Sequence, residues 1–452
     1  MTTRKTLLLA LFALLLLASG CRALPVEALF SPSTPVPVTE APTEAPTAEA
    51  REINIPAADP TEAPTPVPTA TPSPEPTATP TPEPTPTPVP TPAVASIGAI
   101  GDIMIPSGII GDVRSGGTYD FSALFAPCKD LFQSVDLMCG NLEVPLAGES
   151  AGYSAMLSGE SNIPRFNAPD SLLDALKDVG FDLLTTANNH ILDKETDGMY
   201  RTAEVIREAG FYQTGTFLDE DDRETPCIIE VNGIRVGIVA ATRVINERMK
   251  HISMDEAHVA VGLLSEGDQL TEDVLRDLER VKDAGAEFVI VFAHWDYENP
   301  NPVDKVTRRL AEQLLKAGAD CIIGSHPHYV KSMEYMTVTR GDEEYTGLVA
   351  FSLGDFTANE GFERSTGLFL KLTLEKDFES GEVTLTDAAY LPTFVMRRAI
   401  EKPRFAAFPV YDDLSLLKAF RLSSNETRTL NRAREYALNI IGDVDDLRLL
   451  DE

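Results

Sequence analysis

Three apolar, β-branched runs in this sequence end in polar turns that carry four of its six histidines. The runs are FDLLTTANNH, which ends at His190, EFVIVFAHW, which carries His294, and DCIIGSHPH, which carries His326 and His328. Continuous apolar runs of this length are typical of parallel strands buried on both faces. In open α/β sheets, ligands and catalytic groups gather at the carboxyl ends of such strands. The pattern therefore predicts an α/β fold with a metal or acid–base site at one rim, because imidazole is a frequent metal ligand and a proton carrier near neutral pH.

Residues 1–20 have the features of an export signal rather than of a folded domain. The segment consists of Arg4 and Lys5, an almost pure Leu/Ala run from Thr6 to Leu17, and the small residues Ala18-Ser19-Gly20. It resembles a bacterial lipoprotein signal, with Ala18 where a Leu is usual, so we expect Cys21 to be lipidated and residues 21–30 to form a membrane-proximal anchor. The alternative is an ordinary signal peptide or an uncleaved anchor, although the apolar run is shorter than the roughly 20 residues of a membrane span.

Residues 31–93 form a Pro/Thr-rich, low-complexity segment. It repeats Thr-Pro, Glu-Pro and Ala-Pro units and contains no aromatic residue. Such a composition cannot bury a core. Proline at this density favours extended polyproline II, at about 3.1 Å per residue. We therefore expect a disordered stalk that spans on the order of 100–200 Å and separates a folded domain from a membrane.

The rest of the chain is long enough for one large domain, predicted over residues 94–400, and a helical C-terminal extension over 401–452. The net charge of the protein is −32. The stalk contributes only eight acidic residues against Arg51, so the folded part is strongly acidic as well. Nucleic-acid binding needs a basic face, so we expect no nucleic-acid partner.

Four cysteines in the folded part, Cys128, Cys139, Cys227 and Cys321, show no CxxC spacing. Cys139 and Cys321 lie in strand-like runs and are interpreted as buried thiols. Since an exported protein with four cysteines can form disulfides, their pairing stays open at this point.

Apolar runs alternate with amphipathic segments until the final third, which is rich in strands. Helices are predicted over 169–179, 195–209, 271–284, 303–317, 412–420 and 426–439, and strands that follow one another directly over 331–391. Asn232-Gly233 between two apolar runs predicts a hairpin. Alternating β and α units followed by antiparallel strands indicate a mixed α/β domain of two sheets with outer helices.

Six polar turns supply the candidate site residues. They carry Asp102; Asn141 and Glu143; Asn188, Asn189, His190 and Asp193; His294, Asp296 and Glu298; His326 and His328; and Ser352 and Asp355. A mixed Asp/Asn/His shell suits Zn, Mn or Fe rather than Ca. One or two such ions could polarise a phosphoryl or carbonyl oxygen and activate water. Structural roles compete: Asp193 could cap the following helix, and Ser352 and Asp355 could order a loop.

The order of these turns resembles the CapA family of poly-γ-glutamate capsule biosynthesis proteins, over about Ser96 to Phe362. The motifs stand here as Gly101-Asp102-Ile103-Met104, Asn141-Leu142-Glu143, Asn188-Asn189-His190 with Asp193, His294-Trp295-Asp296-Tyr297-Glu298, His326-Pro327-His328 and Ser352-Leu353-Gly354-Asp355-Phe356. Two residues depart from the family pattern: Asp296 replaces Gly and Asp355 replaces Asn. Both departures add negative charge near the expected site.

That family in turn resembles the calcineurin-type metallophosphoesterases, which implies a four-layer sandwich of two mixed β-sheets flanked by helices. The resemblance implies metal ligands at Asp102, Asn141, Asn189, His294, His326 and His328, catalytic roles for His190 and Glu143, and substrate contacts for Asn188, Glu298, Ser352 and Asp355. Met104 stands where those enzymes have a His ligand, and Asn141 where they have a bridging Asp. Whether the site holds a single ion or a second one through Glu143 therefore stays open, and so does the two-metal mechanism.

Together these features predict an extracytoplasmic, lipid-anchored protein that acts in synthesis or export of an anionic poly-γ-glutamate-like polymer. Its expected partners are that polymer, or the membrane proteins that make or export it. Metal-assisted hydrolysis or transfer is one form of this function, and whether the chain is an enzyme stays open. The alternatives are a non-catalytic polymer-binding scaffold and an extracytoplasmic phosphodiesterase unrelated to capsule.

Overall fold

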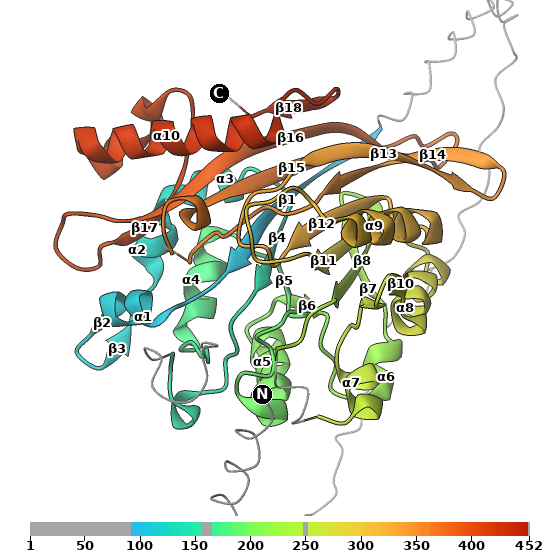
Figure 1. The fold of residues 1–452 in the computed structure, drawn as a ribbon, viewed down its shortest axis with the longest axis horizontal. Helices are drawn as coiled ribbons and strands as arrows, with labels where there is room; N and C mark the ends of the chain where they lie inside the picture. The colour runs from blue at the N-terminus through green and yellow to red at the C-terminus, as the bar shows by residue number, and fades with distance from the viewer. Residues whose placement is uncertain (1–91, 155–164, 247–251, 359, 451–452) are drawn as a thin grey trace, which may run out of the picture. The chain divides into compact units, whose positions relative to one another are not determined.

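The structure of the protein is a computed structural model that describes residues 92–154, 165–246, 252–358 and 360–450 (Figure 1). The predicted signal, Cys21, the anchor 21–30 and all but the last two residues of the stalk lie outside the described residues. Within the described ranges, no helix combines the length and the hydropathy that a bilayer span would need.

The first sheet joins strands from both ends of the described chain. Its order is β17 (Phe405–Pro409), β16 (Val383–Arg397), β15 (Thr366–Lys376), β1 (Ala93–Ile103), β4 (Leu137–Leu142), β5 (Leu183–Thr185) and β6 (Tyr212–Thr214), with β18 (Leu447–Leu449) paired to β16. Strands β1, β4, β5 and β6 run parallel, whereas β15 is antiparallel to both β1 and β16. The carboxyl ends of the parallel strands therefore meet at one edge of this sheet.

The second sheet has the order β13 (Met333–Arg340), β14 (Glu343–Ala350), β12 (Cys321–Ser325), β11 (Phe288–His294), β8 (Ile234–Thr242) and β7 (Cys227–Val231). Its four central strands are parallel, and β7 and β13 are antiparallel edges. Asn232 and Gly233 both have positive φ, 50° and 84°, as a tight hairpin between β7 and β8 requires. The predicted hairpin is confirmed.

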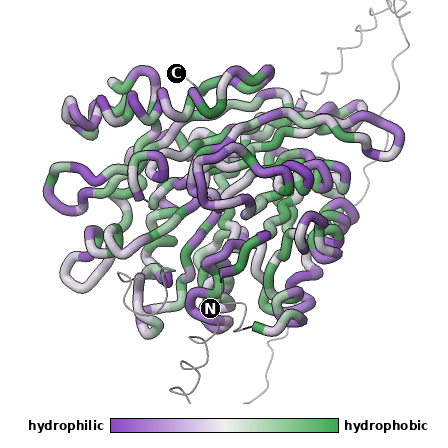
Figure 2. Tube along the Cα trace, in the orientation of Figure 1, coloured by the Kyte–Doolittle hydropathy of each residue, from purple (hydrophilic) through white to green (hydrophobic). Residues whose placement is uncertain are grey.

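Strand β11 shows why its sequence is a continuous apolar run. Phe288, Ile290 and Phe292 face a core that lies between the two sheets. The alternate residues, Val289 and Val291, pack in a separate core with helices on the outer face. A strand buried on both faces needs apolar residues at every position. Figure 2 shows hydrophobic residues along the central strands and hydrophilic residues on the outer helices and turns.

Helices cover the outer faces of both sheets. Those over the second sheet are α8 (Glu272–Asp283) and α9 (Lys305–Ala317), and those packed with the first include α1 (Ser107–Val113), α2 (Ser122–Phe125), α3 (Lys129–Phe132) and α4 (Ser171–Val179). The remaining helices are α5 (Glu195–Glu208), α6 (Glu220–Glu224), α7 (Met254–Ala260) and α10 (Ser424–Ile441). The order helix, sheet, sheet, helix is the four-layer sandwich that was expected.

The predicted helix boundaries follow from local capping. Thr271 accepts a hydrogen bond from the backbone of Val274 and begins α8, and Asp304 begins α9 in the same way. Gly180 and Gly318 end α4 and α9 in the left-handed conformation that glycine adopts without penalty.

Residues 401–452, predicted as a helical extension, supply α10 and also two strands, β17 and β18, which both pair with β16. Arg398 joins α10 to the sheet through a 2.8 Å hydrogen bond from its Nε to Glu426. Cys128, Cys139, Cys227 and Cys321 form no disulfide within the described residues.

Candidate metal centre

The polar turns predicted from the sequence come together where the two sheets meet. Asp102 and Asn141 are paired positions near the ends of β1 and β4. His294 ends β11 opposite Ser325, the last residue of β12. The turns after β5, β12 and β14 add Asn189, His326, Asp355 and their neighbours. The parallel strands of both sheets thus deliver their terminal residues to one buried cluster.

Asp102 connects the two sheets. Its carboxylate is fully buried, and Oδ1 accepts a 2.7 Å hydrogen bond from Asn141 Nδ2. Oδ2 accepts a 3.0 Å bond from the backbone N–H of His326 in the second sheet. Burial raises the pKa of Asp102 to about 6, against the opposing influence of nearby His328. The preceding Gly101 is required sterically, since a Cβ there would lie 1.8 Å from the carbonyl oxygen of Gly354.

Three imidazoles in the cluster are oriented by hydrogen bonds. His294 lies 2.8 Å from Asn189 Oδ1 through Nε2 and 2.8 Å from Ser325 Oγ through Nδ1. His328 Nδ1 lies 2.7 Å from Asp355 Oδ1, and His190 Nδ1 lies 2.8 Å from an Asp193 oxygen. Partners of this kind fix the tautomer and the ring orientation of a histidine.

Burial keeps the second-sheet histidines neutral. It lowers the pKa of His326 to about 3 and that of His328 to about 4, and it holds the pKa of His294 well below its usual value. Neutral imidazole is the form that binds metal. His326 and His328 also have positive φ, 92° and 62°, a conformation that costs non-glycine residues on the order of 1–3 kcal/mol and clusters at functional sites.

Several buried polar atoms of the cluster have no hydrogen-bond partner among the described residues. They are both carboxylate oxygens of Glu143, Nδ1 of His326 and Oδ2 of Asp355. Burial raises the pKa values of Glu143 and Asp355 well above the usual range, and neighbouring carboxylates raise that of Glu143 further. Leaving a buried polar atom unpaired costs about 1–3 kcal/mol. Such atoms in one place point to an ion or ligand that completes the site.

The spacing of these groups fits a divalent cation. Ligand atoms lie within 4.8 Å of one another in three overlapping sets: Glu143 with His326 and His328; Asp102 with His328 and Asp355; and Asp102 with Glu143 and His294. Nitrogen and carboxylate ligands together suit Zn, Mn or Fe. Glu143, predicted as catalytic, thus lies among the candidate ligands. When bound, such a cation polarises a substrate oxygen and makes a bound water more acidic.

Three residues predicted to contact substrate lie around this cluster in different settings. Asn188 is buried and donates a 2.9 Å hydrogen bond to the carbonyl of Leu142. Ser352 is buried, and its Oγ accepts a 3.1 Å bond from the backbone of Gly354. The Glu298 side chain is half exposed and places Oε2 3.9 Å from His328 Nε2. Glu298 therefore approaches the cluster from the solvent side, whereas the other two order its turns.

Asp193 orients His190 rather than capping α5. One of its oxygens contacts His190 and accepts a 2.7 Å bond from the backbone of Phe166. The residue before α5, Lys194, provides no side-chain cap. The Asp193–His190 spacing of three residues was visible in the sequence, but only the turn geometry makes the contact.

Two residues that support the cluster were given no role from the sequence: Ser325 was noted only as the end of its apolar run, and Lys331 was missed. Ser325 contacts His294, and its position opposite that residue in β12 was a usable signal. Lys331 is buried and donates to the backbone carbonyls of Asn299 and Asn301, which fixes the turn that carries Glu298. The same turn holds Asp296 at φ 68°, a left-handed conformation that explains the Gly of the family pattern.

Comparison with known proteins points to one family. Residues 96–360 match the family model described as bacterial capsule synthesis protein PGA_cap. The capsule biosynthesis protein CapA of Bacillus anthracis is 28% identical over 276 residues, 59% of this chain and 60% of that protein. The PGA biosynthesis protein CapA of Bacillus subtilis (strain 168) is 24% identical over 274 residues, 60% of this chain and 65% of that protein. The chain thus matches less than two thirds of the length of these relatives.

Two solved structures show weaker likeness. A novel phosphatase from Mycoplasma pneumoniae is 14% identical with a TM-score of 0.36, covering 67% of this chain and 95% of that one. The protein TT1561 of Thermus thermophilus is 9% identical with a TM-score of 0.32, covering 64% of this chain and 97% of that one. At these scores neither structure bears on the activity of this chain.

Proposed function

Because this chain belongs to the bacterial capsule synthesis protein PGA_cap family, whose model matches residues 96–360, we propose that it acts in synthesis or export of an anionic poly-γ-glutamate-like capsule polymer. It works outside the cytoplasm, held to the membrane by a lipid on Cys21 and raised from it by the Pro/Thr-rich stalk. Its partners are the polymer, or the membrane proteins that make or export it.

The observation that supports a chemical role for this chain is the buried cluster of candidate metal ligands, several of whose atoms have no hydrogen-bond partner among the described residues. In this proposal Asp102, Glu143, His294, His326 and His328 hold one or two ions of Zn, Mn or Fe, with Asn141 and Asn189 beside them. Carboxylates with raised pKa values and imidazoles with lowered ones are costly to bury together. A divalent cation offsets this cost, because it favours ionised carboxylates and neutral imidazoles at once.

His190 is the proposed proton carrier. Asp193 holds its Nδ1, which leaves Nε2 on the side of Glu143, 4.0 Å from the nearest carboxylate oxygen. A histidine in this position can protonate a leaving group beside the cluster. The reaction class that follows is hydrolysis or transfer at a phosphoryl or amide centre of the polymer or its precursor.

A polymer-binding scaffold without catalysis is the second candidate, and two departures favour it. Met104 lies buried in the core beside the first sheet instead of supplying an imidazole. Asn141 donates its amide hydrogen to Asp102 and cannot act as a bridging carboxylate. Both departures remove ligands that a two-metal mechanism would use.

His190→Ala in the full chain separates the two candidates. A lost general acid costs about 10²–10⁴-fold in rate. We expect a deletion strain complemented with this variant to make no surface polymer, while the purified variant keeps its metal content and melting temperature. His326→Ala is the matched variant, which should lose most of the metal.

Full complementation by His190→Ala would support the scaffold. A chain that binds no metal after purification without chelator and with Zn or Mn supplied would contradict the metal centre. Turnover of a model phosphodiester by a protein that is dispensable for polymer would favour a phosphodiesterase unrelated to capsule.

A further inference from the structure

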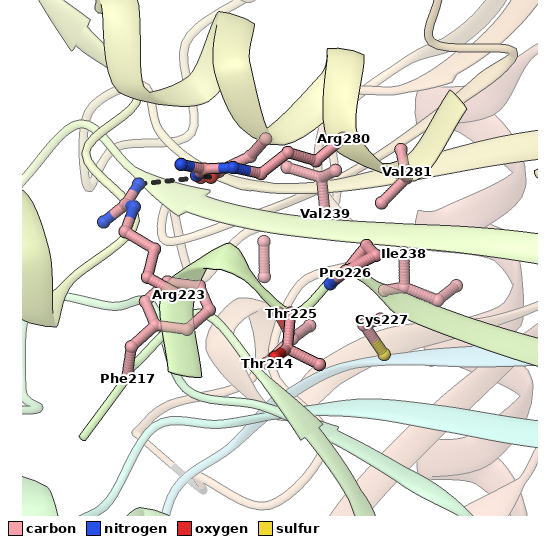
Figure 3. Close-up of a pocket in the computed structure, with 12 residues that line it drawn as sticks. Thr214, Phe217, Arg223, Thr225, Pro226, Cys227, Ile238, Val239, Arg280 and Val281 are labelled. Atoms are coloured by element: carbon pink, nitrogen blue, oxygen red, sulfur yellow. Dashed lines mark hydrogen bonds and ion pairs between the residues drawn. The ribbon is translucent and has the colours of Figure 1, made fainter. Parts of the chain in front are cut away.

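The buried cation Arg223 is satisfied within the fold. Arg223 lies with Phe217 and Arg280 around a hollow of about 20 Å³, which accommodates roughly one water molecule (Figure 3). Its guanidinium donates a 2.7 Å hydrogen bond to Asp277. This hollow therefore has neither the room nor a free charge for a ligand. The surface near the C-terminus differs, because several of its cations have no partner.

The C-terminal part of the chain reverses the charge of the protein. Residues 397–441 contain nine Lys and Arg against five Asp and Glu, whereas the whole chain has a net charge of −32. They comprise the end of β16, β17, the 3₁₀-helix η5 (Leu414–Phe420) and α10. Residues 96–360 match the family model, so this cationic segment lies outside the match. Its excess of positive charge is therefore a property of the C-terminal segment rather than of the matched domain.

η5 is held alongside the first turns of α10, which runs along the outside of the first sheet (Figure 1). Before η5, Asp412 lies 3.4 Å from the guanidinium of Arg434 in α10. At the end of η5, Arg398 donates a 2.7 Å hydrogen bond to the carbonyl of Phe420 and a 2.8 Å bond to Glu426 in α10. These contacts join both ends of η5 to α10. We call residues 412–434 the C-terminal lobe.

The acidic side chains of the C-terminal lobe are engaged within the fold. Two of them form the ion pairs just described, and Asp413 caps η5 by accepting hydrogen bonds from the backbone and the hydroxyl of Ser415. By contrast, Lys418, Arg421 and Arg428 are exposed and have no ion pair or side-chain hydrogen bond among the described residues. An anionic surface that approaches the lobe therefore meets three free cations.

Exposed aliphatic side chains accompany these cations. Leu416 in η5 is 45% exposed, and Ile400, two residues beyond Arg398, is 48% exposed. Cations beside exposed aliphatic groups fit the surface of a bilayer, where Lys and Arg meet anionic headgroups and apolar side chains enter the acyl boundary. A dissolved polyanion would use the cations alone. The combination therefore favours a lipid surface as the partner.

We propose that the C-terminal lobe binds the surface of a membrane that contains anionic lipid, with Lys418, Arg421 and Arg428 on the headgroups and Leu416 at the acyl boundary. This inference rests on the proposed membrane location and does not involve the metal centre. The proposed lipid on Cys21 keeps the lobe near the bilayer and raises its effective concentration there. Because the rest of the chain is strongly acidic and is repelled by anionic lipid, this contact also orients the domain.

Vesicle sedimentation of the full chain tests the inference. Cys21→Ala is the background for all variants, so that no lipid anchor holds the protein, and any contribution of the N-terminal residues is the same throughout. The probes are vesicles of phosphatidylcholine alone and vesicles that also contain phosphatidylglycerol. We expect binding to increase with phosphatidylglycerol and to decrease with added salt, because salt screens the contact between exposed charges.

Replacing Lys418, Arg421 and Arg428 together by Gln should weaken the phosphatidylglycerol-dependent binding roughly a hundredfold, about fivefold for each cation at a membrane surface. Leu416→Ala should weaken it roughly threefold through lost apolar contact.

The matched control replaces three exposed cations of α9 by Gln, which changes the net charge equally and should leave binding as in the background; they are Lys305, Arg309 and Lys316. Melting temperatures near that of the background show that both triple variants fold.

Loss of binding in the lobe variant but not in the α9 variant supports the inference. Equal binding of the two triple variants would overturn it, as would binding that does not depend on phosphatidylglycerol. Displacement from vesicles by dissolved poly-γ-glutamate, with no effect of Leu416→Ala, would also overturn it and assign the lobe to a soluble polyanion. Metal content separates these failures from failure of the proposed function, which fails if the wild-type chain binds no metal.

Discussion

Two buried polar clusters of this molecule use their charges in opposite ways. Near α6 and α8, Arg223 donates to Asp277 at 2.7 Å and to the backbone carbonyls of His258 and Val261 at 2.8 Å each. In the candidate metal centre, the two carboxylate oxygens of Glu143 have no such donor among the described residues. The first cluster has satisfied its polar groups within the fold. The second keeps unpaired polar groups, which lower the stability of the fold unless a bound ligand supplies their partners.

The balance of charge explains the difference. Burial raises the pKa of Asp277, but Arg223 and Arg280 oppose that increase. For Glu143, burial raises the pKa and the nearest charged groups, Asp102 and Asp355, raise it further. A buried group that opposes folding is retained when function needs it. The comparison therefore predicts opposite effects on the free energy of unfolding. Substitutions in the first cluster should lower it, whereas substitutions in the second should leave it unchanged or raise it in the metal-free protein.

The largest effect is expected from Arg223→Met. This change leaves Asp277 buried without its principal partner and three backbone carbonyls without a donor, so the free energy of unfolding should fall by about 3–5 kcal/mol. Urea unfolding measures it. Arg280→Gln, at a more exposed side chain, should cost about 1 kcal/mol or less. A loss below about 1 kcal/mol for Arg223→Met would show that this cluster does not stabilise the fold.

An intermediate effect is expected from Glu143→Gln. This change should lower the affinity for metal but not the stability of the metal-free protein. The affinity for Zn or Mn should fall at least about tenfold, which corresponds to about 1.4 kcal/mol. The metal-free protein should be as stable as the wild type or more so at pH 7, because a carboxylate with a raised pKa destabilises the fold when it is ionised. Metal titration and urea unfolding in chelator check the two parts. Lower stability of the metal-free variant would contradict the proposed contrast.

The smallest effect is expected at the ion pair between Arg398 and Glu426, where α10 meets the first sheet. This pair is less buried than either of the two clusters. Burial raises the pKa of Glu426, but hydrogen bonds from Arg398 and Ser423 outweigh it and hold that pKa below its usual value. Its charge therefore stabilises the fold above the unfolded pKa of 4.5, and this contribution is lost as the pH falls through the lowered folded pKa.

Glu426→Gln keeps the capping side chain and removes only the charge. It should cost about 1 kcal/mol or less at pH 7 and less at pH 3 than at pH 7, because the lowered pKa means that the charge is lost as the pH falls. Urea unfolding at both pH values measures the difference. An equal cost at the two pH values would mean that packing, not charge, holds α10 in place.

The sequence was sufficient to locate the cluster but not to assign the contacts within it. His294, His326 and His328 were predicted because continuous apolar runs identify buried parallel strands, whose ends must meet. The helix ends at Gly180 and Gly318 followed from glycine's freedom at positive φ. These features depend on local pattern, which a single sequence contains.

Contacts across the cluster depend on distances between turns from different strands. Asp355 was assigned to substrate binding, yet in the structure its Oδ1 lies 2.7 Å from His328 Nδ1. Lys331 was not predicted at all, because its role comes from carbonyls about thirty residues away that the loop geometry brings to it. Burial also decides protonation, and no local pattern reveals that Glu143 is fully buried among other carboxylates.

The hydrogen bond from the His326 backbone to Asp102 links residues that are 224 positions apart in the chain. One sheet supplies Asp102 and Asn141, and the other supplies His294 and His326. During folding or synthesis, a chain with only its first strands in place would hold carboxylates and amides but none of the second-sheet imidazoles. If the cluster binds a cation as proposed, the full ligand set exists only once both sheets have formed. Metal uptake would then come late in maturation, because partly made chains would lack the ligands of the second sheet.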